Sequence, residues 1–234
     1  MAESLLLTSL NEAEREALAP YIRVRELHNG QTLLEAGEPI ESVWFPHNCV
    51  TSTVVDARDG STIEVGLMGA EGMVGLSLLL GHDISNTTVI VQIPGMATEM
   101  RAGDFKELVV KPHGSAFSRL LEYTDAFMAM VAQTAACNSL HGIDERLARW
   151  ILMTQDRTGG DEMPLTQEFL AYMLGVRRAS VSMTASGLQQ MGLITYSRGH
   201  VRILDREGLE EASCDCYGIV RRIVKGLYGE KRAA

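Results

Sequence analysis

The sequence predicts an α+β fold: an N-terminal antiparallel β-roll (double-stranded and jelly-roll-like), a long dimerisation helix and a C-terminal winged helix-turn-helix. Three observations predict it. Short runs rich in Val, Ile and Thr alternate with glycine turns over about 22–110, an uninterrupted apolar repeat follows over 113–137, and two short helical patterns flank a glycine over 166–191. We therefore divide the chain into a roll (1–112), a dimerisation helix (113–141), a helix-turn-helix domain (142–210) and a helical tail (211–234).

The N-terminal part carries two local signals of its elements. Ser9 and Glu12 have the spacing of a capping box, and Pro20 follows, which predicts a short helix over 9–19. Asp59-Gly60 separates two strand-like runs, TSTVVDARDG and STIEVGLMG, and predicts a hairpin there. Short strands with turn signals at this spacing are typical of a compact antiparallel barrel or sandwich.

The predicted long helix carries an apolar seam. Six residues recur at spacings of four and three: Phe117, Leu121, Thr124, Met128, Val131 and Ala135. Such a heptad seam is typical of helices that pair in a coiled coil, so it predicts a homodimer. The seam is shorter than three heptads, and a helix packed against its own domain is the alternative.

A second helix is predicted directly after the first one. His141-Gly142 interrupts the long helix, and Asp144 is in place to cap the segment DERLARWILMTQDR. The apolar residues of this segment, Leu147, Trp150, Ile151 and Met153, lie on one side of a helix, and Gly159-Gly160 marks the turn that follows.

The segment 165–204 carries the pattern with the clearest function. Thr166 is a good helix N-cap, and Gly175 allows the positive φ of a tight turn between two helices. Ala171 is small enough for a close helix crossing, and Val181 supplies an apolar anchor on the second helix. Two strand-like runs, LITYS and HVRIL, follow and predict a wing with Arg198 at its tip.

The charge distribution favours nucleic acid as the partner of this segment. The chain has a net charge of -9, but residues 175–206 hold five arginines and one acid, a net charge of +4. The remainder holds 16 basic and 29 acidic residues, a net charge of -13. A basic island on an acidic protein is what local phosphate contact requires, although a solvated basic face is the alternative.

These residues resemble the CRP/FNR family of bacterial transcription regulators over nearly the whole chain. The stretch LTQEFLAYMLGVRRASVS and the hairpin after it carry the resemblance most specifically, and Gly37-Glu38-Pro39 and EGMVGLSLLL fit the family's roll. The resemblance implies a homodimer that binds a palindromic site on double-stranded DNA and is controlled by a signal sensed in the roll. The resemblance is also compatible with RNA polymerase as a further partner.

The resemblance also implies which residues contact DNA. Arg178 lies where family members read a guanine. The other expected contacts come from the start of each helix and from the wing: Thr166, Gln167, Arg177, Ser180, Ser182 and Arg198. Two positions depart from the family pattern, because Ala179 stands where many relatives have Glu and Met183 where they often have Arg. We therefore expect an operator that differs from the usual family site.

The sequence indicates the identity of the effector less clearly than it indicates the DNA contacts. By resemblance, the effector residues are Gly75, Leu76, Ser77, Asn86, Thr87, Gln133 and Thr134. Leu76 stands near the Glu of nucleotide-binding members, and Ser85 or Asn86 stands near their Arg. Because 75–88 holds no basic residue except His82, we do not expect cAMP, and another polar ligand is the alternative. For Gln133 and Thr134, a place beside the dimer seam is an equal interpretation.

The cysteines predict no metal centre. An iron–sulfur sensor of this family needs clustered cysteines near the N-terminus, and none precedes Cys49. Cys214 and Cys216 form a close pair with no further Cys or His beside them in the sequence, so we expect no metal there, and redox sensing stays open. The cofactor is unknown.

Composition excludes several classes of protein. No apolar run approaches the length of a membrane span, and the N-terminus lacks the pattern of a signal peptide, so we expect a cytoplasmic protein without a membrane partner. No nucleophile, phosphate-loop or metalloprotease motif is present, so we do not expect an enzyme. A small-molecule sensor that acts through protein contacts, with a vestigial DNA head, is the alternative function.

Overall fold

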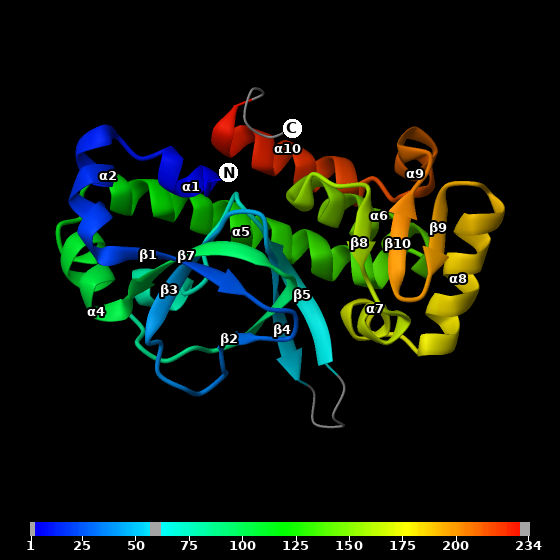
Figure 1. Ribbon diagram of the computed structural model, residues 1–234, viewed down its shortest axis with the longest axis horizontal. Helices are drawn as coiled ribbons and strands as arrows, with labels where there is room; N and C mark the ends of the chain where they lie inside the picture. Colours follow the sequence, from blue (N-terminus) through cyan, green and yellow to red (C-terminus); the bar gives the residue numbers. More distant parts are fainter. Residues whose placement is uncertain (1–2, 57–61, 230–234) are drawn as a thin grey trace.

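The computed structural model describes residues 3–56 and 62–229. Figure 1 shows three parts: a β-roll, a long helix α5 (Ser115–Leu140) that runs along the roll, and a C-terminal head of helices with a small sheet. The predicted α+β fold and the order of its parts are confirmed. No helix among these residues is long and apolar enough to cross a bilayer.

The chain begins with two short helices, α1 (Leu5–Thr8) and α2 (Glu12–Leu18), and a 3-10 turn η1 (Ala19–Tyr21). The predicted capping box is wrong by two residues. Asn11 is the N-cap of α2: its side chain accepts from the Glu14 amide at 2.9 Å, and the Glu14 carboxylate accepts from the Asn11 amide at 3.2 Å. Ser9 instead donates its hydroxyl to the carbonyl of Leu6, which ends α1.

The roll consists of two antiparallel sheets, as predicted. One sheet has the order β1-β7-β3, formed by β1 (Ile22–Leu27), β7 (Gly95–Arg101) and β3 (Ser42–Pro46). The other has the order β2-β6-β4-β5, formed by β2 (Thr32–Leu34), β6 (Thr88–Ile93), β4 (Val50–Asp56) and β5 (Thr62–Met68). Strands β4 and β5 pair antiparallel on either side of the predicted Asp59-Gly60 turn, which lies outside the described residues.

The core of the roll lies between its sheets and beneath α5. Phe45 of β3 and Met100 of β7 are buried in the same cluster as Leu120 and Tyr123 of α5. Each large apolar side chain contributes about 1.5–3 kcal/mol by leaving water, so this cluster fixes α5 against the roll. Three short helices close the ends of the roll: α3 (Leu76–Leu79), α4 (Ala102–Phe105) and the π-helical η2 (Lys106–Val110).

The head follows α5 after a break at His141. Its elements are α6 (Ile143–Thr158), β8 (Glu162–Pro164), α7 (Gln167–Leu174), α8 (Arg178–Gln190), β9 (Ile194–Ser197), β10 (His200–Ile203) and α9 (Arg206–Ala212). The predicted cap of α6 is wrong: Gly142 is the N-cap, its amide donates to Glu145 at 2.9 Å, and Asp144 lies inside the first turn.

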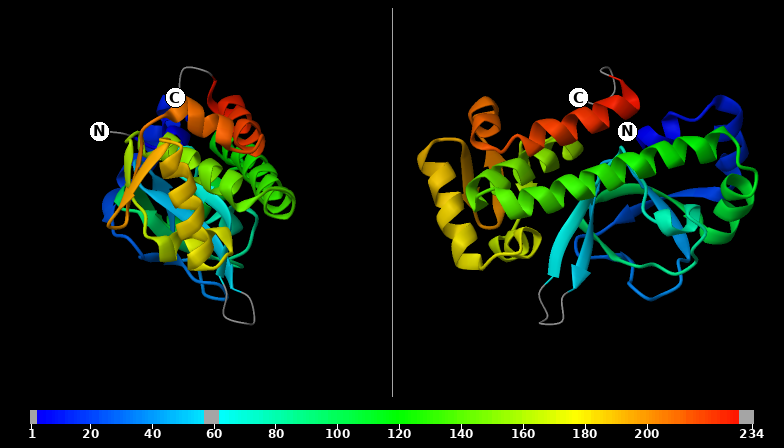
Figure 2. Two further views of the ribbon diagram at one scale, coloured as in Figure 1. Left: turned by 90° about the vertical axis from the view of Figure 1, so that its right-hand side faces the viewer. Right: turned by 180° about the vertical axis from the view of Figure 1, so that it is seen from behind.

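The last helix, α10 (Cys216–Tyr228), returns from the head and lies alongside α5 (Figures 1 and 2). Near its end, the Leu227 carbonyl accepts a hydrogen bond of 2.5 Å from Arg119 of α5. The guanidinium of the same Arg119 lies 4.9 Å from the centre of the Tyr228 ring. The tail is therefore part of the packed structure, and it links the head back to the roll end of α5.

A buried carboxylate group joins the roll to the head. Glu64 of β5 accepts from the indole of Trp150 in α6 at 3.0 Å, from Gln92 of β6 at 2.7 Å and from the hydroxyl of Ser52. The amide nitrogen of Gln92 also lies 2.8 Å from the sulfur of Met173 in α7. Two helices of the head thus meet three strands of the roll, β4, β5 and β6, around one polar group.

A second buried contact supports the same interface. Arg157 of α6 forms an ion pair of 2.7 Å with Glu71 of the roll, and both side chains are only 6% exposed. The Glu71 carbonyl also accepts a hydrogen bond from Tyr228 of α10. Removing one partner of a buried ion pair leaves an uncompensated charge, which typically costs about 3–5 kcal/mol, so these contacts hold the head in one position.

The Glu64 site predicts a pH dependence of stability. Burial raises the pKa of this carboxyl, and hydrogen bonds from Ser52 and Trp150 offset only part of that increase. The folded protein therefore holds this proton to a higher pH than the unfolded chain does. Its contribution to the free energy of unfolding is present below the ordinary Glu pKa and is lost as pH rises through the raised value.

We expect Glu64→Gln to remove this loss, because glutamine is a neutral isostere of the protonated carboxyl. Urea unfolding measured at a series of pH values should show a smaller decrease in stability above the ordinary Glu pKa than in the unmodified protein. Glu26→Gln, on the exposed surface of β1, serves as the control and should keep the original slope. Equal slopes in both variants would contradict the assignment.

Candidate nucleic-acid interface

The two helices of the predicted helix-turn-helix meet as the sequence indicates. Thr166 caps α7, and its hydroxyl accepts from the Phe169 amide at 3.2 Å. Gly175 ends α7 with a φ of +63°, in the left-handed region that favours glycine. Val181 is fully buried and Ala171 is 9% exposed, so both pack inside the head. Local capping, the glycine turn and this apolar contact together fix the angle at which α8 is presented.

The predicted wing is present and has three strands rather than two. Strands β9 and β10 form a hairpin, and β8 pairs with the other edge of β10. Arg198 and Gly199 form the hairpin tip, with φ values of +51° and +79°. The Tyr196 hydroxyl donates to the Leu165 carbonyl at 2.7 Å, and burial raises the pKa of this tyrosine to about 12. This contact fastens the wing to the start of α7.

The helix starts and the wing tip surround one polar depression of about 440 Å³. It is lined by Thr166, Gln167, Glu168, Arg178, Tyr196, Arg198 and Gly199. Four of the seven predicted DNA contacts therefore face a common surface, and they include two of the three predicted arginines, Arg178 and Arg198. Glu168 adds one carboxylate at the rim. Two guanidinium groups, hydroxyls and a helix start are suited to bind an anion such as a phosphate.

The other predicted DNA contacts lie beside this depression. Arg177 is exposed and forms the N-cap position of α8, and Ser180 follows half-buried in the first turn. Ser182 is exposed and accepts from Gln167 of α7 at 3.5 Å, which joins the two helices on this face. Of the two positions that depart from the family pattern, Ala179 is exposed and Met183 is 74% exposed, so α8 presents apolar groups there.

A cavity of about 450 Å³ lies between the roll and α5. Five of the seven predicted effector residues line it: Gly75, Leu76, Ser77, Asn86 and Thr87. Gly75 has a φ of +103°, and a Cβ there would come within 2.8 Å of Val43, so only glycine fits. Gln133 and Thr134 are not among its lining residues; Gln133 donates to the sulfur of Cys216, and Thr134 accepts from Arg149.

The wall of this cavity is mostly apolar. Its lining side chains come from the roll and from three turns of α5: Leu34, Thr53, Val65, Met68, Met73, Val74, Leu76, Ser77, Leu80, Ser85, Asn86, Thr87, Val89, Thr124, Phe127, Met128, Val131 and Ala132. Among these described residues there is no Lys or Arg. A cyclic phosphate placed there would lack a charged hydrogen-bond partner.

The predicted dimer seam is divided between two faces of α5. Leu121 is 38% exposed, Met128 is 57% exposed and Ala135 is exposed as well, each seven residues from the next. Thr124 is only 4% exposed and donates to the Leu120 carbonyl, while Phe117 packs against the core of the roll. Val131, half-buried, lines the cavity. The exposed residues Leu121, Met128 and Ala135 therefore form one stripe along α5, which we call the free stripe.

The structure brings Cys214 and Cys216 together with two residues that the sequence analysis did not connect to them. Cys137 and His141, at the end of α5, lie beside this pair, and the four ligand atoms all fall within 4.8 Å of one another. The sequence analysis could not connect these residues, because Cys137 and His141 lie far from Cys214 and Cys216 along the chain. They meet only where α10 packs beside α5 in the folded protein. The hydrogen bond to Cys214 and the charge of Arg149 lower the pKa of Cys137.

A roll with a cavity beside α5, a long helix and a winged helix-turn-helix define a DNA-binding regulator with a sensing domain. Family models agree with this assignment: residues 24–111 match the cyclic nucleotide-binding domain, and residues 145–212 match the Crp-like helix-turn-helix domain. The "Probable transcriptional regulator flp" of Lacticaseibacillus casei is 26% identical over 210 residues, covering 88% of this chain and 94% of that protein.

Solved structures show the same fold. A CRP-family transcriptional regulator of Thermus thermophilus superposes with a TM-score of 0.69 at 18% identity, covering 81% of this chain and 96% of that one. FixK2 of Bradyrhizobium japonicum superposes with a TM-score of 0.64 at 15% identity, covering 82% of this chain and 98% of that one. The chain belongs to the CRP/FNR family of transcription regulators.

Two glycines of the helix-turn-helix should respond oppositely to alanine. Gly175→Ala forces an L-residue into the left-handed region and should destabilise the fold by about 1–2 kcal/mol. Gly187→Ala lies inside α8 with nothing within 4 Å of the new Cβ, and it should stabilise by about 0.5–1 kcal/mol. Urea unfolding of both variants measures this difference, and a shift of the same sign in both would contradict the described turn.

Proposed function

We propose that this regulator binds a palindromic DNA site as a homodimer, with α8 in the major groove and the wing on the adjacent backbone. The observation that carries this proposal is the shared depression in which Arg178 and Arg198 meet the starts of two helices. Helix starts and hydroxyls suit phosphate contacts, which position the protein, while an arginine on the recognition helix can bridge the O6 and N7 atoms of guanine.

The exposed face of α8 supports a distinct base preference. Ala179 and Met183 offer apolar atoms where an acid or an arginine would offer hydrogen bonds. Apolar groups in the major groove favour the methyl group of thymine. We therefore infer that each half-site has a thymine-containing base pair next to the guanine read by Arg178. Relatives with a glutamate at the position of Ala179 would instead read that base pair with a carboxylate.

We infer that the free stripe of α5 forms the dimer interface, and that it pairs with a second copy through Leu121, Met128 and Ala135. Small residues lie beside this stripe, since Ala129 and Ala132 are exposed on the same side, and they permit close approach of two helices. Figure 2 shows α5 passing from the roll to the head, so a paired α5 would connect the sensing and DNA-binding parts of both copies. A two-fold axis of this kind matches a palindromic site.

The cavity supports an effector that is mostly apolar, with a polar end near Ser77, Asn86 and Thr87, in place of a cyclic nucleotide. Such an occupant would touch α5 at Met128, which is itself a residue of the proposed dimer stripe. It would also touch Val65, the neighbour of Glu64 on β5. Val65 is the extra residue of a β-bulge between β4 and β5, so the strand presents Val65 to the cavity while Glu64 contacts Trp150 of the head.

The DNA proposal predicts a sequence-specific loss in Arg178→Ala. Bound fragments are first selected from the native genome, and affinity for the selected site is then measured over a range of salt. We expect binding to weaken by about 1–3 kcal/mol, roughly 5- to 150-fold, with discrimination lost at one base pair of each half-site.

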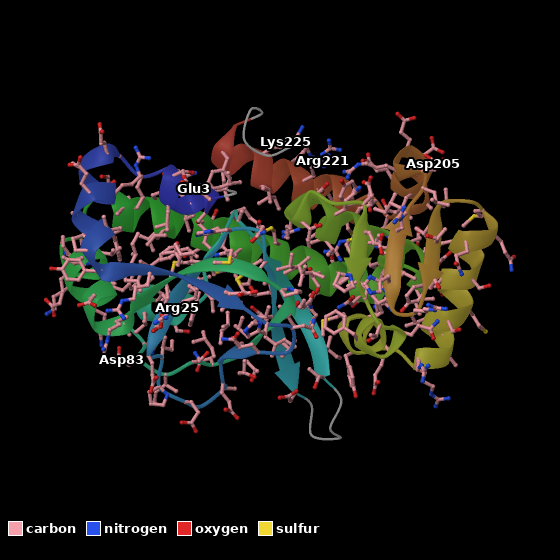
Figure 3. The ribbon with its side chains drawn as sticks, in the orientation of Figure 1. Glu3, Arg25, Asp83, Asp205, Arg221 and Lys225 are labelled. Atoms are coloured by element: carbon pink, nitrogen blue, oxygen red, sulfur yellow. The ribbon has the colours of Figure 1, made fainter. Side chains whose placement is uncertain are left out.

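Arg25→Ala is the matched control, because Arg25 lies on β1 of the roll, far from α8 (Figure 3). This variant should bind DNA as the unmodified protein does. If the unmodified protein binds every fragment equally, and Arg178→Ala changes nothing, a sensor with a vestigial DNA head would be the better account.

The dimer proposal predicts that Met128→Glu separates the two copies. A carboxylate at this position would face its symmetry mate in a desolvated interface, which should weaken association by about 3–5 kcal/mol. Sedimentation velocity measures the change. Val24→Glu, at a 59% exposed apolar position of β1, should leave the dimer intact. A dimer that survives Met128→Glu unchanged would place the interface elsewhere.

A further inference from the structure

We propose that Cys137, His141, Cys214 and Cys216 form a binding site for one divalent metal ion of the zinc class. Cys137 lies in the last turn of α5, and His141 directly follows that helix. Cys214 precedes α10, and Cys216 is its first residue. All three cysteines are buried, and His141 is half-buried. None of these four residues belongs to the proposed DNA interface. The metal-site proposal therefore does not depend on the DNA-binding proposal.

The distances fit four ligands around a single ion. The sulfurs of Cys137 and Cys214 are 3.5 Å apart, and the Cys216 sulfur lies 3.5 Å from Nδ1 of His141. All four ligand atoms lie within 4.8 Å of one another. A tetrahedral zinc ion with sulfur bonds of about 2.3 Å places its ligands about 3.8 Å apart, so this set needs only small adjustments. An iron–sulfur cluster holds several metal ions between its cysteines and requires a wider spacing.

The groups behind the ligands are also those of a metal site. Nε2 of His141 lies 3.5 Å from a carboxylate oxygen of Asp215, which leaves Nδ1 facing the sulfurs. A carboxylate behind a histidine orients the ring for a metal and raises its basicity. The side-chain amide of Gln133 donates to the sulfur of Cys216 at 3.0 Å, a hydrogen bond that a metal-bound thiolate could keep as its outer partner.

The surrounding charge matches as well. Three thiolates, a neutral imidazole and a divalent cation carry a net charge of -1. Arg149 of α6, only 5% exposed, acts on Cys137 with its positive charge and donates to Thr134 of α5 at 3.0 Å. Its Nε has no hydrogen-bond partner among the described residues. The buried guanidinium of Arg149 would therefore offset the net negative charge of the occupied site, and its Nε remains available to donate a hydrogen bond.

A disulfide explains fewer of these features. Cys137 and Cys214 are near enough to form one after a small movement, since a disulfide bond is about 2.05 Å long. Such a bond needs neither a third thiol nor an imidazole backed by a carboxylate. The metal site uses all four groups, and it would tie α10 to the junction of α5 and α6, where the head begins.

The test is metal binding by the full-length, fully reduced protein. Titration with Co²⁺ alone should give the absorption bands of tetrahedral thiolate coordination at one ion per chain, and Zn²⁺ should displace the cobalt. We expect Cys137→Ser, Cys214→Ser and Cys216→Ser to weaken Zn²⁺ binding by more than about 100-fold, because loss of a second-shell partner alone costs about 10- to 100-fold.

Cys49→Ser is the matched control, because Cys49 is buried in the roll among Leu27, Val91 and Ala97. It should bind one ion as the unmodified protein does. If the serine variants fail to fold, His141→Cys keeps four ligands and should bind one cobalt ion with stronger thiolate absorption. The proposal is overturned if the reduced protein takes up no stoichiometric Co²⁺ or Zn²⁺, if Cys49→Ser loses binding equally, or if anaerobically purified protein carries a Cys137–Cys214 disulfide or an iron–sulfur chromophore.

Discussion

The buried hydrogen bonds around Glu64 are the constraint on which the arrangement of this regulator depends. A carboxyl group that is removed from water must find partners, and here the partners come from both the roll and the head: Ser52 and Gln92 on one side, Trp150 on the other. Because each buried polar group that loses its partner costs about 1–3 kcal/mol, the head has one favoured position on the roll. The orientation of α8 and of the wing follows from that position.

Strands β4 and β5 connect this contact to the cavity. Thr53 of β4 and Val65 of β5 line the cavity, while their neighbours Ser52 and Glu64 bond to each other and Glu64 accepts from Trp150 of the head. A ligand that moved these strands would therefore act on the polar contact directly, without a separate relay. The proposed dimer stripe borders the cavity from the other side, through α5. The proposed metal site lies at the end of α5, so it would set the stiffness of the junction between this helix and the head.

The sequence predicts those parts of the molecule that local chemistry determines. The helix-turn-helix is predictable because Thr166 and Gly175 act on their own backbone, and apolar periodicity reveals the helices on either side. The cap of α2 is misplaced because Ser9–Glu12 and Asn11–Glu14 share one spacing, and only packing selects between them. The cluster of three cysteines and His141 and the Glu64 contact are missed for a different reason. Cys137 and Cys214 are 77 residues apart, and Glu64 and Trp150 are 86 apart, so no local pattern connects them.

A double-mutant cycle on Glu64 and Trp150 tests the central claim most directly. Trp150→Phe removes the indole donor while keeping an aromatic ring, and Glu64→Leu removes both acceptor oxygens while keeping an apolar side chain of similar size. The free energy of unfolding is measured for the unmodified protein, both single variants and the double variant at one pH. The account predicts a coupling energy of about 1 kcal/mol or more, because the two residues bridge the roll and the head. Additive effects would show that the contact does not hold the two parts together.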